Sequence, residues 1–497
     1  MESWRSIVIL GCVAVYLAMC IGVGLWAMRR TKTTQDFFMA GRHLGILVAS
    51  VAVFSSTMSG FGFVGGPGLV YQMGTSSLWM VVCTSIGFCI SFFLLGKRLR
   101  LFAELRDSIS LPDAVAARYK SNATRLLTAV AILIGVLSYL AAQILAMAVV
   151  LEVILGELDW HLSLPICATI SCAVLVFYCV TGGIIASVYT DLLQGLVMMI
   201  AAVLVLVTVI NAVDGGFEGM SRTIMEDDRE AMGPWGTLGM FGCLSWFFVF
   251  AIGAAGQPHV VTKMMMTKNV RDARHMLPVS VFGYAVSALL WIGIGLAMRA
   301  LVLQGAHPSL GKADEAAPQF LLSVHTHSLL AGVVFAGLLA AIMSTADSFL
   351  NIGAAAVVHD IPRAIRGRSL KRELLWARVA TVVIAVVAAI IALNAGKLIG
   401  LLGALAWGTF AAALVPVVAI GFNWKRATPL AACVAISSSL VINISIEIAT
   451  KLYGFKMPYN INGGAIALLV SLTLFLGISF CSRPPRLDPD IEAVMDL

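Results

Sequence analysis

The sequence predicts an all-α polytopic membrane protein with about 13 transmembrane helices. Its composition supports this prediction, because 60% of the 497 residues are apolar and only 12% are charged, whereas soluble proteins carry about 25% charged residues. The apolar residues also fall into runs of roughly 18 to 30, each long enough to cross a hydrocarbon core about 30 Å thick. These runs lie near residues 7–28, 45–72, 76–96, 126–155, 163–181, 188–212, 237–262, 277–302, 326–357, 374–393, 398–422, 428–449 and 463–481.

The positively charged residues between the runs predict the orientation of the chain. Cytosolic loops are enriched in Lys and Arg, and most of the 33 Lys and Arg residues fall in alternate loops, among them 97–125, 263–274 and 363–372. Lys263 is assigned to the second of these loops. An acidic cluster at 226–230 falls in a loop of the opposite set. The N-terminus is therefore expected outside and the C-terminus in the cytosol, in a plasma or inner membrane.

The remaining composition narrows the expected partners. The net charge of +7 is explained by topology, so it gives no reason to expect a nucleic-acid partner. The ten cysteines are scattered singly, without the spacing of a metal or redox motif, and are expected to be small buried apolar residues. The expected partners are the lipid bilayer and a small solute, and the sequence does not predict the oligomeric state.

Two runs contain clusters of Gly and Pro, which need a reason in a membrane helix because they interrupt its backbone hydrogen bonds. The second run reads SSTMSG at 55–60 and is rich in glycine up to Gly68, and the seventh reads GAAGQPH at 253–259. They lie five runs apart, as in an inverted repeat, and matched interruptions indicate a binding site at the middle of the membrane. The alternative is that these glycines only permit close helix packing.

The repeat predicts the organisation of the chain. We expect an extra N-terminal helix and cytosolic loop (1–44), a first five-helix repeat (45–212), a second five-helix repeat (237–422), two C-terminal helices (428–481) and a cytosolic tail (482–497).

Polar residues inside the runs are the candidate site residues. The ninth run reads AIMSTADS at 341–348, and its hydroxyl groups could simply bond back to their own helix. Asp347 favours a functional interpretation, because a carboxylate inside a membrane span is costly and is kept for a purpose. Asp191 is a second such acid, although at a helix start it could serve only to stabilise the helix dipole. Hydroxyls, carbonyls and carboxylates together suit a small hard cation, or the two acids could relay protons.

These features together resemble the sodium/solute symporter family, and within it the sodium/proline permease branch. The matching strings are FMAGR at 38–42, MSG at 58–60, TGG at 181–183 with TD at 190–191, GQPH at 256–259 and AAIMST at 340–345. The resemblance runs from about residue 7 to residue 480. It implies a LeuT-like core of two inverted five-helix repeats and alternating access, with Na⁺ as the coupling ion.

The resemblance also implies two cation sites. Its main sodium site would use the carbonyl groups of Ser55, Met58 and Ala341 and the hydroxyl groups of Ser344 and Thr345. A second cation site, present in some members of the family, would use Asp191, Ser344, Asp347 and Ser348. A stoichiometry of two sodium ions is therefore one of the alternatives.

The expected solute site departs from the proline permeases at three positions. This chain has Thr57 where they carry an acid, and Phe250 and Ala254 where they carry Trp and Tyr, while the tyrosine of the fourth run is kept as Tyr139. Amino acids such as proline and small carboxylates both stay open as solutes. The expected solute-binding residues are Thr57, Ser59, Gly60, Tyr139, Gln143, Trp246, Phe250, Ala254 and Gln257.

The function predicted from the sequence is sodium-coupled symport of a small organic solute into the cell. A membrane enzyme is not expected, because the sequence has neither a G-x-S-x-G nor an H-E-x-x-H motif. A solute sensor would usually carry an added signalling domain, and the predicted tail after Cys481 is short. A proton-coupled symporter, using Asp191 and Asp347, stays the main alternative.

Overall fold

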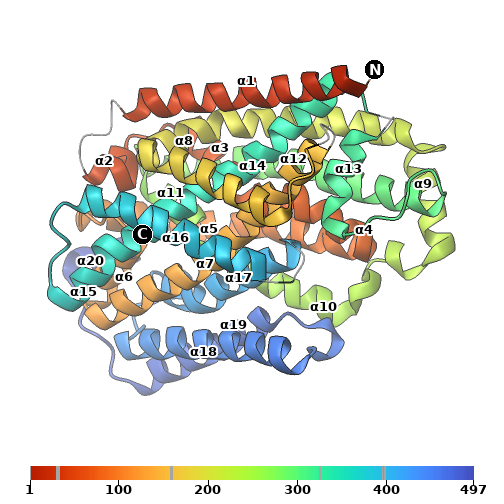
Figure 1. Cartoon of the computed structure of the whole chain (residues 1–497). Coiled ribbons are helices and arrows are strands. Elements are labelled where there is room, and N and C mark those ends of the chain that lie inside the picture. The colour runs from red at the N-terminus through yellow and green to blue at the C-terminus, as the bar shows by residue number, and fades with distance from the viewer. Residues whose placement is uncertain (1, 29–33, 157–159, 324–325, 395, 397–398) are drawn as a thin grey trace.

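The computed structural model describes residues 2–28, 34–156, 160–323, 326–394, 396 and 399–497, and no β-strand is found among them (Figure 1). The predicted all-α fold class is confirmed. The α-helices are α1 (Glu2–Met28), α2 (Thr34–Met39), α3 (Ile46–Gly60), α4 (Gly66–Met73), α5 (Leu78–Leu105), α6 (Leu111–Tyr119), α7 (Asn122–Gly156), α8 (Leu164–Ala212), α9 (Gly216–Asp227), α10 (Gly239–Trp246), α11 (Pro258–Met265), α12 (Asp272–Leu303), α13 (Ala316–Leu322), α14 (Ser328–Ala355), α15 (Ile361–Arg366), α16 (Glu373–Asn394), α17 (Ile399–Leu414), α18 (Pro429–Tyr453), α19 (Gly463–Cys481) and α20 (Pro489–Met495). In Figure 1, α1 lies along one edge of the bundle, and α18 and α19 lie along the opposite edge.

The apolar helices coincide with the predicted spans. Within the described residues, 11 helical segments are long and apolar enough to cross a membrane. One of them, Ile46–Leu105, contains two predicted spans, which are separated by the short 3₁₀ helix η3 (Gly74–Ser77). A shorter apolar helix, Leu164–Phe177, corresponds to the predicted span at 163–181. Each of the thirteen predicted runs therefore lies on an apolar helix.

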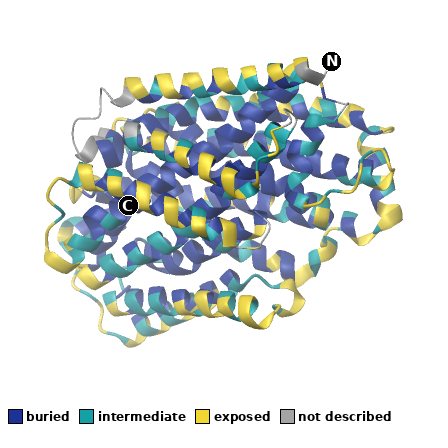
Figure 2. Cartoon of the chain, viewed as in Figure 1, coloured by how far each residue is buried: buried dark blue, intermediate teal, exposed yellow. Residues whose placement is uncertain are grey.

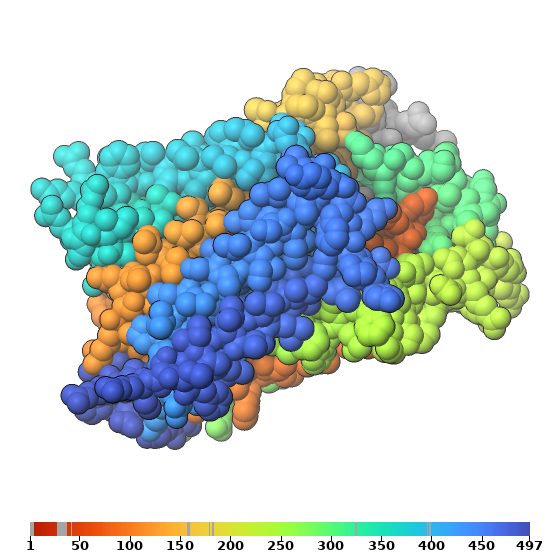
Figure 3. All heavy atoms as spheres, turned by 90° about the horizontal axis from the view of Figure 1, so that it is seen from below, coloured from red at the N-terminus to blue at the C-terminus, as the bar shows by residue number. Residues whose placement is uncertain are grey.

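The outer helices of the bundle have exposed sides (Figure 2), and many of the side chains exposed there are large and apolar. Phe93 in α5, Val383 in α16 and Val441 in α18 are exposed, Phe93 to 86%. Seen from below, the C-terminal helices α18 and α19 extend across the face of the molecule (Figure 3). Such a surface would be unfavourable in water and is the surface expected toward lipid.

Both predicted helix interruptions are present. The helix that begins as α3 passes through a π-helical turn, η2 (Phe61–Gly65), before it continues as α4, and Ser59 has a φ of 51°. The second interrupted helix runs from α10 through η6 (Phe247–Ile252) and η7 (Gly253–Gly256) to α11, with Gln257 in an extended conformation. Backbone groups freed at such breaks can bind ions or solutes.

A third change of direction occurs inside α8. Gly183 has a φ of 61° and a ψ of −171°, so two helical segments meet at this residue. A Cβ at Gly183 would lie 2.6 Å from the Phe37 ring, so glycine satisfies both the backbone conformation and the close packing here. The junction falls between the predicted spans at 163–181 and 188–212.

The loops meet in two groups, as alternate loops must. On one side, Arg42 pairs with Asp107 (3.1 Å) and Arg106 pairs with Asp488 (2.7 Å). On the other, the Thr75 hydroxyl donates to the Gly233 carbonyl (3.0 Å). The grouping agrees with the predicted alternation, and which group faces the cytosol stays a prediction.

The assignment of Lys263 to a loop was wrong. Lys263 lies in α11, and its side chain is only 2% exposed. The reason is that the second half of the interrupted helix begins at Pro258 and continues to Met265, three residues beyond the predicted end of the span.

Candidate functional site

The break in α3 lies against the middle of α14, where most of the predicted main sodium site is assembled. The Ser344 hydroxyl donates to the carbonyl groups of Ser55 and Ala341, at 3.1 Å each. The Thr345 hydroxyl donates to Ala341 (3.1 Å) and to the carbonyl of Ser56 (2.8 Å). All of these residues are buried. Carbonyl and hydroxyl oxygens are the ligands that a small hard cation prefers, so the residues present fit sodium.

Met58 lies one turn further along α3, at the break itself. Its carbonyl accepts a hydrogen bond from the N–H of Phe61, and the described hydrogen bonds do not link it to α14. Its role as a sodium ligand stays a prediction.

The predicted second cation site contains a cation from the protein itself. The Nζ atom of Lys263 lies 3.1 Å from Asp191 Oδ2 and 3.2 Å from the Ser348 hydroxyl. It also donates to the Ser56 hydroxyl (2.6 Å) and to the Ala52 carbonyl (2.8 Å). Both members of the ion pair are buried, Asp191 completely. The structure therefore brings Asp191 and Ser348 together, but around an ammonium group that the sequence analysis had placed elsewhere.

Asp347 is the second buried carboxylate of this region. The Ser187 hydroxyl donates to Asp347 Oδ1 (2.8 Å). In the described part of the chain, Asp347 Oδ2 and Asp191 Oδ1 have no hydrogen-bond partner. Two carboxylates, Asp191 and Asp347, thus share this buried region with one ammonium group.

The predicted solute-binding residues of α3 and α7 meet at the first break. Ser59 Oγ lies 3.3 Å from the Tyr139 hydroxyl, and the Gly60 N–H donates to Gln143 Oε1 (2.8 Å). A Cβ at Gly60 would lie 2.7 Å from the Ile342 side chain and 2.9 Å from Gln143 Oε1. Gly60 is therefore needed for the close approach of α3 to α7 and α14.

Residues of the second break complete this region. Gln257 Nε2 donates to the carbonyl groups of Gly253 (3.2 Å) and Trp407 (3.1 Å). The Thr57 hydroxyl donates to Val53 of its own helix (2.7 Å) and lies 3.4 Å from His259 Nε2. The two interrupted helices thus face each other across Thr57 and His259.

Aromatic rings surround the two breaks. Phe250 is stacked with Phe61 (centroids 6.2 Å apart) and packs against Trp407 (5.3 Å) and Trp246 (6.1 Å). The methyl group of Ala254 points toward α5, away from these rings. A Cβ at Gly87 of α5 would lie only 2.5 Å from it. A side chain larger than Ala at 254 would therefore press on α5.

Besides Trp291 Nε1, which belongs to a ring packed against Gly62 and Gly66, four buried polar atoms near the breaks have no hydrogen-bond partner in the described part of the protein. They are Gln143 Nε2, Gln257 Oε1, His259 Nδ1 and Trp407 Nε1. The other bonds of the two amides fix their orientation, because Gln143 accepts from Gly60 and Gln257 donates to two carbonyl groups. Buried polar groups without partners are costly unless a ligand or water satisfies them. These four atoms therefore mark the region between the two breaks as the candidate solute site.

The sequence analysis did not identify Lys263, His259 or Trp407 as site residues. A signal was available for Lys263, because Pro258 favours the start of a helix and Lys263 lies within the two turns that follow. His259 occurs in the GQPH string and carries the same signal. For Trp407 we find no signal in the sequence, since it lies on α17 and reaches the site only through packing.

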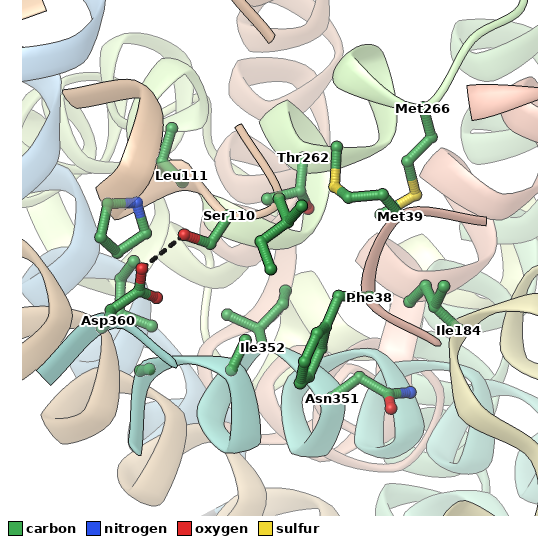
Figure 4. A pocket seen from close by; sticks show the side chains of 15 residues that line it. Phe38, Met39, Ser110, Leu111, Ile184, Thr262, Met266, Asn351, Ile352 and Asp360 are labelled. Atoms are coloured by element: carbon green, nitrogen blue, oxygen red, sulfur yellow. Dashed lines mark hydrogen bonds between the residues drawn. The ribbon is translucent and has the colours of Figure 1, made fainter. Parts of the chain in front are cut away.

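A small cavity of about 30 Å³ lies near this region, lined on one side by residues 109–112 and on another by residues of α14 and the segment that follows it (Figure 4). Thr262 of α11, next to Lys263, lines it together with Phe38, Met39 and Met266. At its other end, the Ser110 hydroxyl donates to Asp360 (2.6 Å). The cavity is large enough for a water molecule but not for an organic solute.

An acidic group with metal-ligand chemistry lies next to this cavity. Among the described residues, ligand atoms of Asp113, His359 and Asp360 lie within 4.8 Å of one another. Asp113 is, however, already paired with His359 (2.9 Å), Arg125 (3.0 Å) and Arg363 (3.4 Å). Burial opposes its ionisation, but these partners outweigh burial and hold the pKa of Asp113 below its ordinary value. The group is therefore an ion-pair network that ties α6 to the π-helical segment η9 (Ala356–Asp360) and to α15, which follow α14.

Comparison with known proteins agrees with this geometry. Residues 37–438 match the sequence profile of the Sodium:solute symporter family. The sodium/proline symporter of Staphylococcus aureus strain JH9 is 27% identical over 509 residues, covering 100% of this chain and 96% of that protein. The structure is similar to a substrate-bound, outward-open Na⁺-coupled sialic acid symporter, with a TM-score of 0.76, 20% identity, and coverage of 97% of this chain and 99% of the other. It is also similar to a closed nucleobase-cation-symport-1 family transporter, with a TM-score of 0.59, 15% identity, and coverage of 94% and 99%.

Proposed function

Because the chain belongs to the sodium:solute symporter family and is therefore a sodium-coupled solute symporter, we propose that it carries an amino acid, with proline as the first candidate, into the cell. The observation that carries this proposal is the set of unpartnered polar atoms at the two breaks. The similarity to a sodium/proline symporter supports proline as the candidate.

The unpartnered atoms match the two ends of an amino acid. Gln143 Nε2 and Trp407 Nε1 are donors, and a solute carboxylate would accept from them. Gln257 Oε1 is an acceptor, and the ammonium group of an amino acid, primary or secondary, would donate to it. A simple carboxylate would satisfy the donors but leave Gln257 Oε1 without a partner, which is why we favour an amino acid.

The aromatic rings would hold the apolar part of the solute. Phe61, Phe250, Trp246 and Trp407 are all buried, and the other three rings each contact the ring of Phe250. Such rings bind a small aliphatic ring through its apolar faces and give it a fixed orientation.

Sodium would act by ordering the break in α3. The hydroxyl groups of Ser344 and Thr345 already lie against the carbonyl groups of Ser55 and Ala341. A sodium ion bound by these oxygens would hold α3 against α14 and fix the Ser59–Gly60 segment, to which the solute binds. This is a population shift, since sodium binds one arrangement of the break more tightly than another.

The energetics would permit strong accumulation. One sodium ion with a zwitterionic solute carries one net charge inward, which yields about 2.3 kcal/mol at −100 mV. A tenfold sodium gradient adds about 1.4 kcal/mol, so accumulation on the order of 500-fold would be supported.

The cavity in Figure 4 would be the closed exit route. It begins beside Thr262 and ends at the Ser110–Asp360 hydrogen bond, and Phe38 and Met39 of the α2 region line it. Movement of α2 and α6 away from α14 would widen it enough for a solute to leave.

Uptake into proteoliposomes tests this proposal. Proline, other amino acids and small carboxylates are offered with sodium or with choline. One of the carboxylates is cyclopentanecarboxylate, which has a CH₂ group in place of the ring nitrogen of proline. We expect an amino acid to accumulate only with sodium, and we expect cyclopentanecarboxylate to be a poor substrate because it cannot donate to Gln257. Ser344→Ala/Thr345→Ala should lose most of the sodium-dependent uptake.

The matched control is Thr381→Ala/Ser439→Ala, because both hydroxyls are buried and donate to carbonyl groups of their own helices. It should transport as the wild type does. Accumulation of cyclopentanecarboxylate as strong as that of proline would contradict the amino-acid assignment. Uptake that follows an imposed pH gradient regardless of sodium would instead favour proton coupling through Asp347.

A further inference from the structure

We propose that the ammonium group of Lys263 permanently occupies the second cation position of this transporter, so that each transport cycle takes a single sodium ion. This inference rests on the proposed function, because it concerns the number of ions that drive the same solute site. It is carried by the arrangement of oxygen atoms around Lys263 Nζ.

The surroundings of Nζ are those of a bound cation. Four oxygens lie within 3.2 Å: the Ala52 carbonyl, the hydroxyls of Ser56 and Ser348, and the carboxylate of Asp191. One negative charge, two hydroxyls and one carbonyl form a set of hard oxygen ligands of the kind a sodium ion would use. The ammonium group has only three hydrogens, so four close oxygens exceed what its own hydrogen bonds require.

A sodium ion cannot share this position with the ammonium group. Asp191 Oδ2 and the Ser348 hydroxyl are the predicted ligands of a second ion, and both already contact Nζ. Two unit positive charges within a few ångströms of each other repel strongly in a buried site. The third predicted ligand, Ser344, is directed to Ser55 and Ala341 instead.

The position of Lys263 in the fold allows its fixed charge to link four helices. Lys263 lies on α11, the second half of one interrupted helix, whereas Ala52 and Ser56 lie one turn apart on α3, the first half of the other. Asp191 and Ser348 come from α8 and α14. A free second ion would bind and leave in each cycle, but a tethered one holds these four helices together throughout.

The charge balance of the region is consistent with a fixed cation. The Lys263–Asp191 pair is neutral and needs no ion from outside. Asp347 is the remaining buried carboxylate, with Ser187 on one oxygen. Of the two buried carboxylates, Asp191 is neutralised by Lys263, and only Asp347 is left to attract a cation that binds and leaves during transport.

Equilibrium binding of ²²Na⁺ to the purified full-length protein tests the inference without knowledge of the solute. We expect the wild type to bind one sodium ion per chain. Lys263→Ala should bind a second ion, because it leaves the carboxylate and hydroxyls free, and its sodium dependence should become cooperative. Lys263→Ala/Asp191→Asn should return to one ion, since the charged ligand is then missing.

Two further variants keep the result interpretable. Lys268→Ala removes an exposed lysine five residues away and should leave the count at one ion. If Lys263→Ala does not fold, the neutral pair Lys263→Met/Asp191→Asn should restore folding and bind one ion, because neither charge is then left without its partner.

The outcomes separate this inference from the proposed function. Two ions in the wild type, an unchanged count in Lys263→Ala, or a Lys263→Met/Asp191→Asn protein as unstable as the single variant would overturn the role of Lys263. No ion in the wild type but one in Lys263→Ala would reject the main sodium site between α3 and α14 while the role of Lys263 stands.

Discussion

At the first break, Ser59 adopts the unusual backbone conformation and Gly60 permits the close helix packing. Ser59 adopts the left-handed conformation, with a φ of 51°, while Gly60 has an ordinary helical φ of −62°. Glycine would adopt the left-handed conformation more easily, but Gly60 is needed one residue later, where α7 and α14 leave no room for a Cβ. The strain at Ser59 therefore lies beside a proposed ligand site, where strained backbone is often found.

Asp314 makes stability depend on pH and lies in the short 3₁₀ helix η8 (Ala313–Glu315), between α12 and α13. Asp314 is 6% exposed, and its carboxylate accepts from the N–H of Ile399, at the start of α17 (2.9 Å). Burial raises the pKa of Asp314 to about 7, and the bond from Ile399 opposes this only in part. In the unfolded chain Asp314 loses its proton near pH 4. Between about pH 4 and pH 7 the folded protein therefore keeps a proton that the unfolded chain has lost, and the stabilisation that this proton gives falls as pH rises.

We therefore expect the free energy of unfolding of the wild type to fall as pH rises from about 4 to 7. Above pH 7, Asp314 should cause no further decrease. Asp314→Asn should reduce this dependence, because the amide oxygen can still accept from Ile399 and never ionises. Thermal unfolding in detergent across this pH range measures both. An identical pH profile in the variant would show that Asp314 is not responsible.

At the scale of elements, the glycines at the end of η2 and the start of α4 serve close packing. A Cβ at Gly65 would meet the backbone of Gly400 at 2.6 Å, and one at Gly68 would meet the Ala313 carbonyl at 2.7 Å. A Cβ at Gly66 would overlap the Trp291 ring of α12. The packing interpretation of the glycine cluster therefore holds for α4, while the break itself lies at Ser59. Close packing thus explains the glycines from Gly65 onward, whereas the binding-site interpretation applies to the break at Ser59.

Gly66→Ala should lower the Tm of the protein, because the indole of Trp291 is fully buried and cannot move away without disturbing α12. Overpacking of this kind costs about 1–3 kcal/mol. The control is Gly477→Ala on α19, where a Cβ would meet nothing within 4 Å. The fraction of each protein that survives heating as a single chromatographic peak measures the effect. Equal Tm values for the two variants would mean that α12 yields easily at this point.

On the scale of the whole molecule, the C-terminal helix α20 and the residues just before it form ion pairs with the loops at one end of the bundle. Lys425 pairs with Glu492 (3.0 Å), and Arg106 pairs with Asp488 and Asp490 (2.7 Å each). These are exposed pairs, each worth little by itself, but they keep the tail next to the basic loops 97–125 and 425–426. The same end of the molecule therefore holds most of the positive charge, as expected for the cytosolic side.

A fusion to residue 497 tests this orientation. Green fluorescent protein attached there should fluoresce, because it folds in the cytosol, and alkaline phosphatase at the same position should be inactive. Both reporters moved to the loop after α9, at 228–229, should give the opposite pattern. Active phosphatase at the C-terminus would invert the topology and exchange the roles of entry and exit for the cavity in Figure 4.

The sequence determined the number and place of the apolar helices, the two interruptions, and the contact of Ser344 with Ser55. The helices and breaks are local properties, because hydropathy and the need to satisfy the backbone in lipid can be read along the chain; the contact came through resemblance to a family. Only the tertiary structure decided the partner of each charge. Lys263 contacts residues 72 to 211 positions away in the sequence, and four helices must pack before an apparent loop lysine becomes a buried cation. In the same way, Trp407 and His259 reach the solute region only once α17 and α11 lie beside the break in α3.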